Sequence, residues 1–369
     1  MPDNDKTTYA SSGVDYSVMD PIKVLAQKKA SETASNLSSF NATEVSASRG
    51  ESAYVWDEGD SYRSLVIEGL GTKNLVADAM REFGDKTYYD AIAQDTIAMV
   101  VNDLIVVGAL PQVVNAYFAI GDSNWMADEQ RASDLINGWA HACDLSGATW
   151  GGGETPTLKG IVNPETIDLG GSAVGVIKDK KNLVLGDKLQ SGDRIVLISS
   201  SGIHANGLTL ARKIGDEIPE GYATKLTDGR SYGESLLTPT PIYVPLVREM
   251  QKSLIDIHYM VNITGHGWRK LMRATKPFTY VLENVPKVPI EFTFIQDKAE
   301  ISNEEMYGNF NMGAGYAIYV SENDAEKVVQ IANDSGFEAV IAGRVEDGEK
   351  RVIIEPLNIT FQGDSLEVR

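Results

Sequence analysis

Short apolar runs alternate with helical patterns from about residue 54 onward, and this alternation limits the fold more than any other feature. Residues 64–67, 112–118 and 169–177 have the length and apolar character of buried strands. Helical patterns run between them, over about 89–107 and 127–143. Strands that alternate with helices predict an α/β layer in the first half of the chain.

The second half repeats this kind of alternation. An apolar strand at 194–199 leads into a loop at 200–207 and a helix from about Leu208. Near the end, a strand at 317–320 precedes a helix that Ser321 starts, with Asp324 as its partner in a capping box. A strand at 337–345 then turns at Asp347–Gly348 into 351–354, which predicts a hairpin and a second α/β domain.

Composition divides the chain into three parts. Residues 1–50 are polar, with one predicted helix from Pro21 to about Leu37, and are interpreted as an arm or lid. Residues 178–191 form a charged connector between the two α/β patterns. We therefore expect a first domain at 51–185 and a second at 186–369.

The charge balance narrows the class of partner. The 33 Lys and Arg face 52 Asp and Glu, a net charge of −19, which argues against a nucleic-acid surface. It is compatible with a nucleotide site, because carboxylates can hold the metal that carries the phosphates. Cys143 is the single cysteine, which excludes an intramolecular disulfide. No apolar stretch has the length of a membrane span, so we expect a cytoplasmic protein without a membrane partner.

The first candidate site lies on the helix at 89–107. At about 100° per residue, Asp95, Met99 and Asn102 share one face, and Asp103 lies next to it. Carboxylates on an apolar helix are costly to bury unless they are paired or bind a cation, and Mg²⁺ prefers such oxygen ligands. The alternative is that Asp95 is exposed and Asp103 lies near the helix end, but the run 97–107 is otherwise apolar.

Two glycine-containing segments are further candidates. Glu68 follows an apolar strand and opens the turn Glu-Gly-Leu-Gly-Thr-Lys, at the strand end where ligands bind in open α/β sheets. Three glycines at 151–153, followed by Glu154, predict a loop whose backbone N–H groups face an anion. An ordinary tight turn and a flexible linker are the alternatives.

The loop at 200–207 is the last candidate. It joins a strand to a helix, so free N–H groups at the helix start can receive a phosphate. His204 in this loop can donate to a phosphate or transfer a proton, with a structural role as the alternative. The sequence has no phosphate loop of the Gly-x-x-x-x-Gly-Lys type, so phosphoryl transfer needs another nucleotide scaffold.

These motifs, in this order, resemble the aminoimidazole ribonucleotide synthetase (phosphoribosylformylglycinamidine cyclo-ligase) family. The resemblance covers about Tyr9 to Glu355, and its order and spacing are specific to the superfamily. Met306-Tyr307 and the Phe-Asn-Met-Gly run at 310–313 favour the purine enzyme. The matching segments are 9–15, 71–73, Asp95, 101–104, 152–155, 168–169, 200–207, 237–240, 263–265, 305–307 and 310–313.

The resemblance implies a fold and an activity. Two α/β domains are expected, the first binding ATP and metal and forming a β-barrel across a homodimer. ATP with Mg²⁺ phosphorylates the amide oxygen of formylglycinamidine ribonucleotide, a phosphoribosyl substrate. A nitrogen of the substrate then displaces phosphate to give 5-aminoimidazole ribonucleotide.

The resemblance also implies site residues. Catalytic roles fall to His204, Lys73 and Asn206, and metal binding to Glu68, Asp95 and Asp103. The residues expected to contact ATP or substrate are Gly69, Gly71, Thr72, Asn102, Gly152, Gly153, Glu154, Thr155, Ser201, Gly202, Thr264 and Gly265.

Three departures from the family pattern leave alternatives open. Glu68 replaces the usual Asp, residues 47–51 replace a Gly-rich lid, and 266–270 replace a glycine-rich run that ends in Glu-Asn. The alternatives are another ATP-using superfamily member, such as a thiamine monophosphate kinase, or a nucleotide-binding paralogue without activity.

Overall fold

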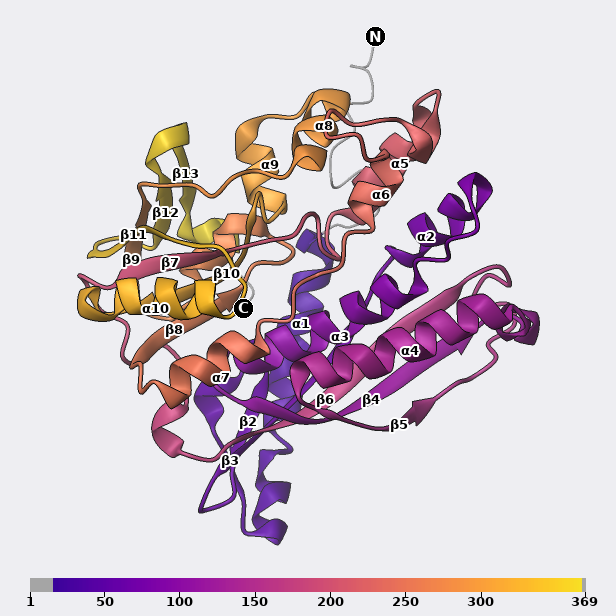
Figure 1. Ribbon diagram of the computed structural model, residues 1–369. Coiled ribbons are helices and arrows are strands. Elements are labelled where there is room, and N and C mark those ends of the chain that lie inside the picture. The colour runs from indigo at the N-terminus through magenta and orange to yellow at the C-terminus, as the bar shows by residue number, and fades with distance from the viewer. Residues whose placement is uncertain (1–15, 367–369) are drawn as a thin grey trace.

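Two β-sheets and the helices that cover them make up the chain (Figure 1). This computed structural model describes residues 16–366, with side chains from residue 21 onward. The segment 9–15, part of the family resemblance, lies outside the described residues. The mixed α/β architecture predicted from the alternating pattern is confirmed.

The first sheet belongs to the N-terminal half. Its six strands lie in the order β1-β2-β3-β6-β4-β5, antiparallel except for the parallel pair β4–β5. The strands are β1 (Thr43–Glu44), β2 (Tyr54–Asp57), β3 (Tyr62–Gly69), β4 (Leu110–Ile120), β5 (Thr149–Glu154) and β6 (Ile167–Ile177). The helices of this half are α1 (Tyr16–Ser31), α2 (Asn74–Met80), α3 (Tyr89–Ile105) and α4 (Glu129–Ser146).

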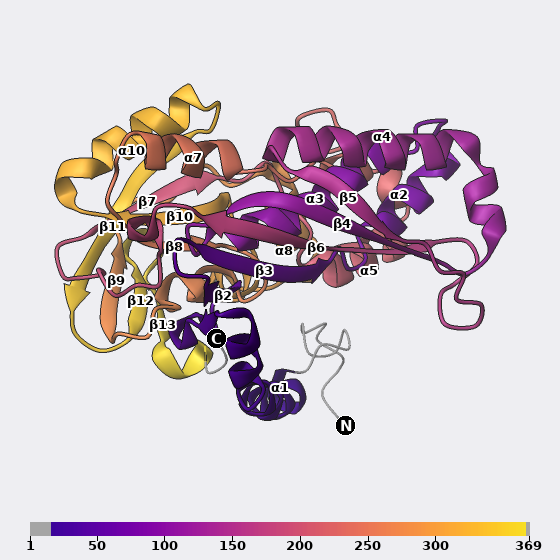
Figure 2. The ribbon, with the colours of Figure 1, turned by 90° about the horizontal axis from the view of Figure 1, so that it is seen from below.

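Helices α3 and α4 cover one face of the first sheet (Figure 2). α3 is buried at every residue except Asp90 and Gln94, because it is enclosed by the sheet, α4 and α7. The opposite face exposes apolar side chains: Leu65 is 44%, Ile67 78%, and Val113 and Tyr117 each 38% exposed. Within one chain the sheet is open, with β1 and β5 at its edges.

The second sheet belongs to the C-terminal half. Its seven strands lie in the order β13-β12-β9-β11-β7-β10-β8, antiparallel except for the parallel pair β12–β9. The strands are β7 (Arg194–Ser199), β8 (Ile257–Asn262), β9 (Phe278–Leu282), β10 (Ala314–Val320), β11 (Ala339–Asp347), β12 (Arg351–Ile354) and β13 (Ile359–Gln362).

Helices α7 and α10 lie side by side on one face of this sheet (Figures 1 and 2). The helices of this half are α5 (Leu208–Glu217), α6 (Tyr232–Leu236), α7 (Val244–Lys252), α8 (Ile290–Ala299), α9 (Asn303–Asn309) and α10 (Glu322–Asp334). β7, β8 and β10 are apolar and buried at nearly every position, as strands covered on both faces must be.

Two segments differ from their predicted secondary structure. The glycines at 151–153 lie in strand β5 and not in a loop. A Cβ at Gly153 would lie 2.3 Å from the backbone oxygen of Ala116, so glycine lets β5 run close beside β4. In the arm, the helix predicted over 21–37 is α1, which ends at Ser31, and a separate 3₁₀ helix over Ala34–Phe40.

Two details at the C-terminal end were predicted wrongly. β11 and β12 do not form a hairpin, because β9 lies between them and pairs with both. Their connection crosses the start of β9, where Thr279 Oγ1 donates to the Glu349 carbonyl at 2.9 Å. Ser321 is the N-cap of α10, but its hydroxyl donates to the Asp324 carboxylate at 3.2 Å and does not cap the helix backbone.

Candidate active site

A buried ion pair connects the two halves of the molecule. The Lys73 ammonium lies 2.8 Å from Asp95 Oδ2, and both side chains are fully buried. Lys73 also donates to the Thr238 carbonyl at 2.9 Å. Asp95 Oδ1 accepts from the Thr240 backbone N–H at 2.8 Å and from its hydroxyl. The first-half pair therefore holds the second-half segment 238–240 from both sides.

Asn102 holds the next part of the same segment. Its amide donates to the Pro241 carbonyl at 2.9 Å and accepts from the Tyr243 N–H at 2.9 Å. Asp95 and Asn102 were expected at a metal and at ATP, and the structure gives both a set of protein partners 139 to 145 residues away. Asp95 and Asn102 therefore connect helix α3 to the second half of the chain.

The loop at 200–207 packs against this segment. Ser201 Oγ donates to the Pro239 carbonyl at 2.6 Å, and the Asn311 amide donates to the Gly202 carbonyl at 2.8 Å. The Ser201 N–H donates to His204 Nε2 at 3.3 Å. Burial, and then the Lys73 charge, lowers the pKa of His204 to about 3, so its imidazole is neutral at physiological pH. The imidazole is an acceptor inside the loop.

A cavity of about 340 Å³ lies between the two halves. Five of the predicted site residues line it: Glu68, Asp103, Asn206, Thr264 and Gly265. It is completed by Lys23, Glu51, Ser52, Met99, His266, Lys270, Arg273 and Leu366. The end of β3, the C-terminal half of α3 and the connection after β8 thus meet at one place.

Two of the three carboxyl groups in this cavity, those of Glu68 and Asp103, interact. Burial, and then the Asp103 carboxylate beside it, raises the pKa of Glu68 to about 8. The Asn262 amide donates to Asp103 Oδ1 at 2.7 Å and orients that carboxylate. Within the described part of the chain, no three His, Cys, Asp or Glu side chains are grouped to hold a metal. Glu68 and Asp103 are the acidic pair that the cavity offers to a cation.

The three cations of this cavity, Lys23, Lys270 and Arg273, were missed as site residues. The Lys270 ammonium donates to Thr264 Oγ1, and burial lowers its pKa to about 8 while Asp103 raises it. Arg273 donates to Ser52 Oγ at 2.8 Å and to the Gly50 carbonyl at 2.9 Å. The sequence signal was the departure of 266–270 from the family pattern, to which no role was assigned.

The residues predicted around the glycine-rich run lie elsewhere. Glu154 is opposite Tyr117 on β4, at the exposed edge of the first sheet. Gly69 and Tyr117 line a second cavity of about 350 Å³ on the open face of that sheet, with Glu68 shared between the two cavities. Gly152, Gly153, Glu154 and Thr155 do not line either cavity.

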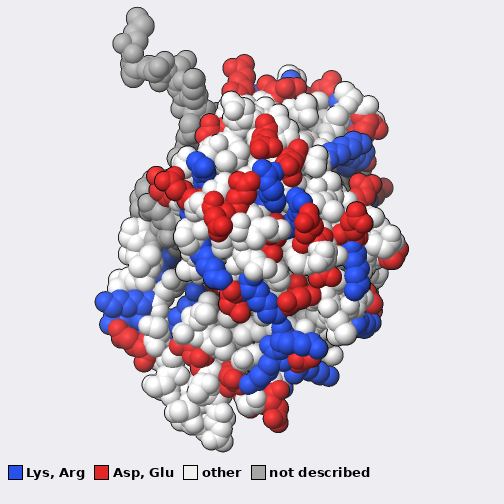
Figure 3. All heavy atoms as spheres, turned by 90° about the vertical axis from the view of Figure 1, so that its left-hand side faces the viewer, with Lys and Arg blue, Asp and Glu red and all other residues white. Residues whose placement is uncertain are grey.

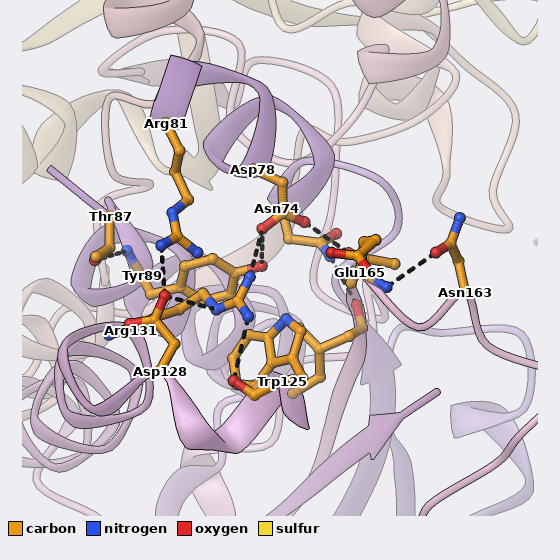
Figure 4. Close-up of polar contacts among 12 residues, drawn as sticks. Asn74, Asp78, Arg81, Thr87, Tyr89, Trp125, Asp128, Arg131, Asn163 and Glu165 are labelled. Atoms are coloured by element: carbon orange, nitrogen blue, oxygen red, sulfur yellow. Dashed lines mark hydrogen bonds and ion pairs between the residues drawn. The ribbon is translucent and has the colours of Figure 1, made fainter. Parts of the chain in front are cut away.

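A polar network fixes α2, the helix that follows Lys73 (Figure 4). Asp78 accepts from the Tyr89 hydroxyl at 2.8 Å and from the Thr166 hydroxyl at 2.7 Å, and Arg131 lies 3.6 Å from it. Asn74 donates to Thr166 at 2.8 Å. Because Asn74 directly follows Lys73, this network anchors the start of α2 next to Lys73.

Family models cover most of the chain. The model for "AIR synthase related protein, N-terminal domain" matches residues 50–177, and its C-terminal counterpart matches 190–355. A phosphoribosylformylglycinamidine cyclo-ligase of Methanococcus maripaludis is 36% identical over 342 residues, 92% of each chain. That of Pyrococcus furiosus is 38% identical over 85% of this chain and 87% of its own. The chain belongs to the AIR synthase family.

The AIR synthase fold also occurs in more distant solved structures. AaThiL complexed with AMPPCP and TMP has a TM-score of 0.57 and 15% identity over 85% of this chain and 90% of that chain. Such low identity establishes a common fold alone. The family predicted from the motifs is confirmed. Over residues 16–366, none of the helices is both long and apolar enough to span a bilayer.

Proposed function

We propose that this enzyme is an ATP-dependent cyclo-ligase that converts formylglycinamidine ribonucleotide to 5-aminoimidazole ribonucleotide. The observation that carries the proposal is the 36% identity to a named cyclo-ligase over 92% of the chain. The kinase alternative rests on a common fold at 15% identity and is not retained. The proposed step transfers the γ-phosphoryl group to the amide oxygen, after which a substrate nitrogen attacks the carbon and phosphate leaves with that oxygen.

Glu68 and Asp103 are the groups proposed to hold Mg²⁺. Both are carboxyl groups, the source of the hard oxygen ligands that this ion prefers. A bound cation would offset the burial and the Asp103 charge that raise the pKa of Glu68. Mg²⁺ would neutralise phosphate charge during transfer. Asn262 keeps Asp103 oriented toward the cavity. Asp95 is retained in the proposal as the group that orients Lys73, because Lys73 and Thr240 already occupy its oxygens.

The three predicted catalytic residues take different places in the proposal. Asn206 lines the cavity, so we assign it the direct contact with ligand. Lys73 and His204 are fully or almost fully buried and are proposed as positioning residues that fix segment 238–240 and the loop at 200–207. Ser201 and Gly202 are proposed to present this loop to a phosphate. The roles of Gly71, Thr72, Glu154 and Thr155 at ATP stay predictions.

A homodimer is part of the proposal. The open face of the first sheet exposes Leu65 and Ile67 on β3 and Val113 and Tyr117 on β4, the two strands that flank β6. A second copy packed on this face would cover that surface and close the sheet edges into a barrel. We also propose a cytoplasmic location, where ATP is supplied. Lys, Arg, Asp and Glu intermingle on the face seen in Figure 3, which does not favour nucleic acid there.

The test of the proposal is product analysis with formylglycinamidine ribonucleotide and Mg²⁺-ATP. One ADP, one phosphate and one aminoimidazole product per substrate are expected. Formation of a stable phosphorylated substrate without ring closure would instead identify a kinase.

A further inference from the structure

The cavity between the two halves is lined by equal numbers of basic and acidic side chains. Its lining includes three cations, Lys23, Lys270 and Arg273, and three carboxyl groups, Glu51, Glu68 and Asp103. A divalent cation on Glu68 and Asp103 would keep both carboxyl groups ionised and would add its two positive charges to this set. A phosphate monoester carries about two negative charges near pH 7. The occupied cavity therefore matches a phosphate monoester in charge.

Lys270 is held in position by a tight turn. The turn begins at Thr264, whose carbonyl accepts from the Gly267 N–H at 3.0 Å. His266 and Gly267 both have positive φ, at 72° and 51°, and a Cβ at Gly267 would lie 2.4 Å from the Tyr307 carbonyl. The turn is therefore packed against α9 and places Thr264 and Lys270 side by side on the cavity wall.

The Thr264–Lys270 contact forms a preorganised donor group. An ammonium has three N–H donors, and Thr264 Oγ1 accepts from one of them. The Thr264 hydroxyl keeps its own proton to donate, because it is the acceptor in this contact. A hydroxyl and an ammonium fixed together are a suitable site for phosphate oxygens.

Arg273, the other cation of this wall, contacts the first half of the chain. Its guanidinium donates to Ser52 Oγ and to the Gly50 carbonyl, and these residues adjoin the cavity lining. It holds the segment 50–52 of the first half at the rim. Arg273 is thus a positioning residue for the cavity. Lys270 instead interacts with Asp103 and Glu68, which also line the cavity.

We propose that Lys270 and Thr264 bind a phosphate group of the ligand in this cavity. The inference rests on the proposed function, and it adds a binding residue that replaces the family's usual glycine-rich run. Two sources of the phosphate share this chemistry: the monoester of the ribonucleotide substrate and the terminal phosphate of ATP.

The test measures binding by calorimetry in the intact protein with Lys270→Met, Lys270→Arg and Thr264→Val. The probes are formylglycinamidine ribonucleotide, its ribonucleoside without phosphate, and Mg²⁺-ATP. Lys270→Met should weaken ribonucleotide binding by roughly 10- to 100-fold, as expected for a hydrogen bond to a charged group. It should leave ribonucleoside binding unchanged, and Lys270→Arg should recover most of the loss.

A matched control and a second variant keep the test decisive. Lys252→Met removes an exposed lysine of α7, paired with Glu249, and should change none of the three affinities. If Lys270→Met does not fold, Thr264→Val removes the partner hydroxyl with little change of shape and carries the same expectation with a smaller loss.

The outcomes are separable. Loss confined to the ribonucleotide assigns the phosphate to the substrate, and loss confined to ATP assigns it to the nucleotide; both support the contact. Equal loss for ribonucleotide and ribonucleoside, or no loss, overturns it. Because these are binding measurements, a wild-type enzyme that binds the ribonucleotide but forms no imidazole would refute the proposed function and leave this inference standing.

Discussion

The Lys73 ammonium and the Asp95 carboxylate lie 2.8 Å apart, with neither side chain exposed to solvent. The pair spans α2 and α3 and extends through Thr238 and Thr240 into the second half of the chain. Burying two charges is costly, so their retention suggests that a defined arrangement of the two halves is needed. Both residues act on the cavity through segment 238–240 and the loop packed against it.

Breaking this pair is expected to destabilise the protein strongly. Asp95→Ala leaves a buried ammonium without its counter-ion, which typically costs about 3–5 kcal/mol of unfolding free energy. Thermal and urea unfolding of the variant measure the loss. Glu32→Ala, which breaks the exposed pair with Lys29, is the control and should change stability by less than about 1 kcal/mol. An unchanged melting temperature for Asp95→Ala would remove the positioning role.

The acidic pair of the cavity is expected to control the Mg²⁺ dependence. Asp103→Asn should lower turnover by roughly 100-fold or more with little loss of stability, since it removes the charge of a proposed metal ligand. Glu68→Asp should be tolerated, because Asp is the residue usual in the family, whereas Glu68→Ala should be far worse. Initial rates across a Mg²⁺ titration separate these cases. Equal behaviour of the two Glu68 variants would make Glu68 a turn residue only.

The open sheet face is expected to be the dimer interface. Ile67→Asp places a charge at the most exposed apolar position of β3 and should convert a dimer to monomer at micromolar concentration. Ile161→Asp is the control: Ile161 is 82% exposed but lies outside this sheet face, so the dimer should persist. Light scattering gives both masses. A monomeric wild-type protein with full activity would contradict the assignment.

Buried His204 is expected to make stability fall in acid. Burial lowers the pKa of His204 to about 3 in the folded state, below the ordinary value of 6.5. Below pH 6.5 the unfolded chain therefore binds a proton that the folded chain does not. The stability that depends on neutral His204 is fully present above pH 6.5 and is lost progressively as the pH falls from there toward 3.

His204→Asn is the variant that isolates this effect. His204 has φ of 60°, a conformation that Asn tolerates better than Ala. The melting temperature of the Asn variant should decline less between about pH 6.5 and pH 4.5 than that of the wild type. Parallel declines in the two proteins would show that His204 is not held neutral.

Regular patterns in the sequence predicted the framework well. The apolar strands β3, β4 and β6 and the helix α3 were placed within a few residues, because local periodicity reflects which faces are buried. The strand character of 151–153 was missed, because three glycines resemble a loop unless the close approach of β4 is known. The insertion of β9 between β11 and β12 has no local signal at all.

The site was predicted in part. Glu68 and Asp103 were identified from the strand and helix patterns, and Asn206, Thr264 and Gly265 from the family resemblance; the fold brings them to one cavity. The partner of Asp95 across the domains, Thr240, is 145 residues away, so the sequence alone could not separate a metal ligand from a buried counter-ion. Lys270 was overlooked because its neighbours are brought together by the turn at 264–267.

The most direct test of the central claim is the stoichiometry of a single reaction. Purified protein is mixed with formylglycinamidine ribonucleotide and Mg²⁺-ATP, and ADP, inorganic phosphate and aminoimidazole ribonucleotide are quantified over time. The account predicts equal amounts of all three and none without Mg²⁺. ATP consumption without aminoimidazole ribonucleotide, or no consumption at all, would contradict it.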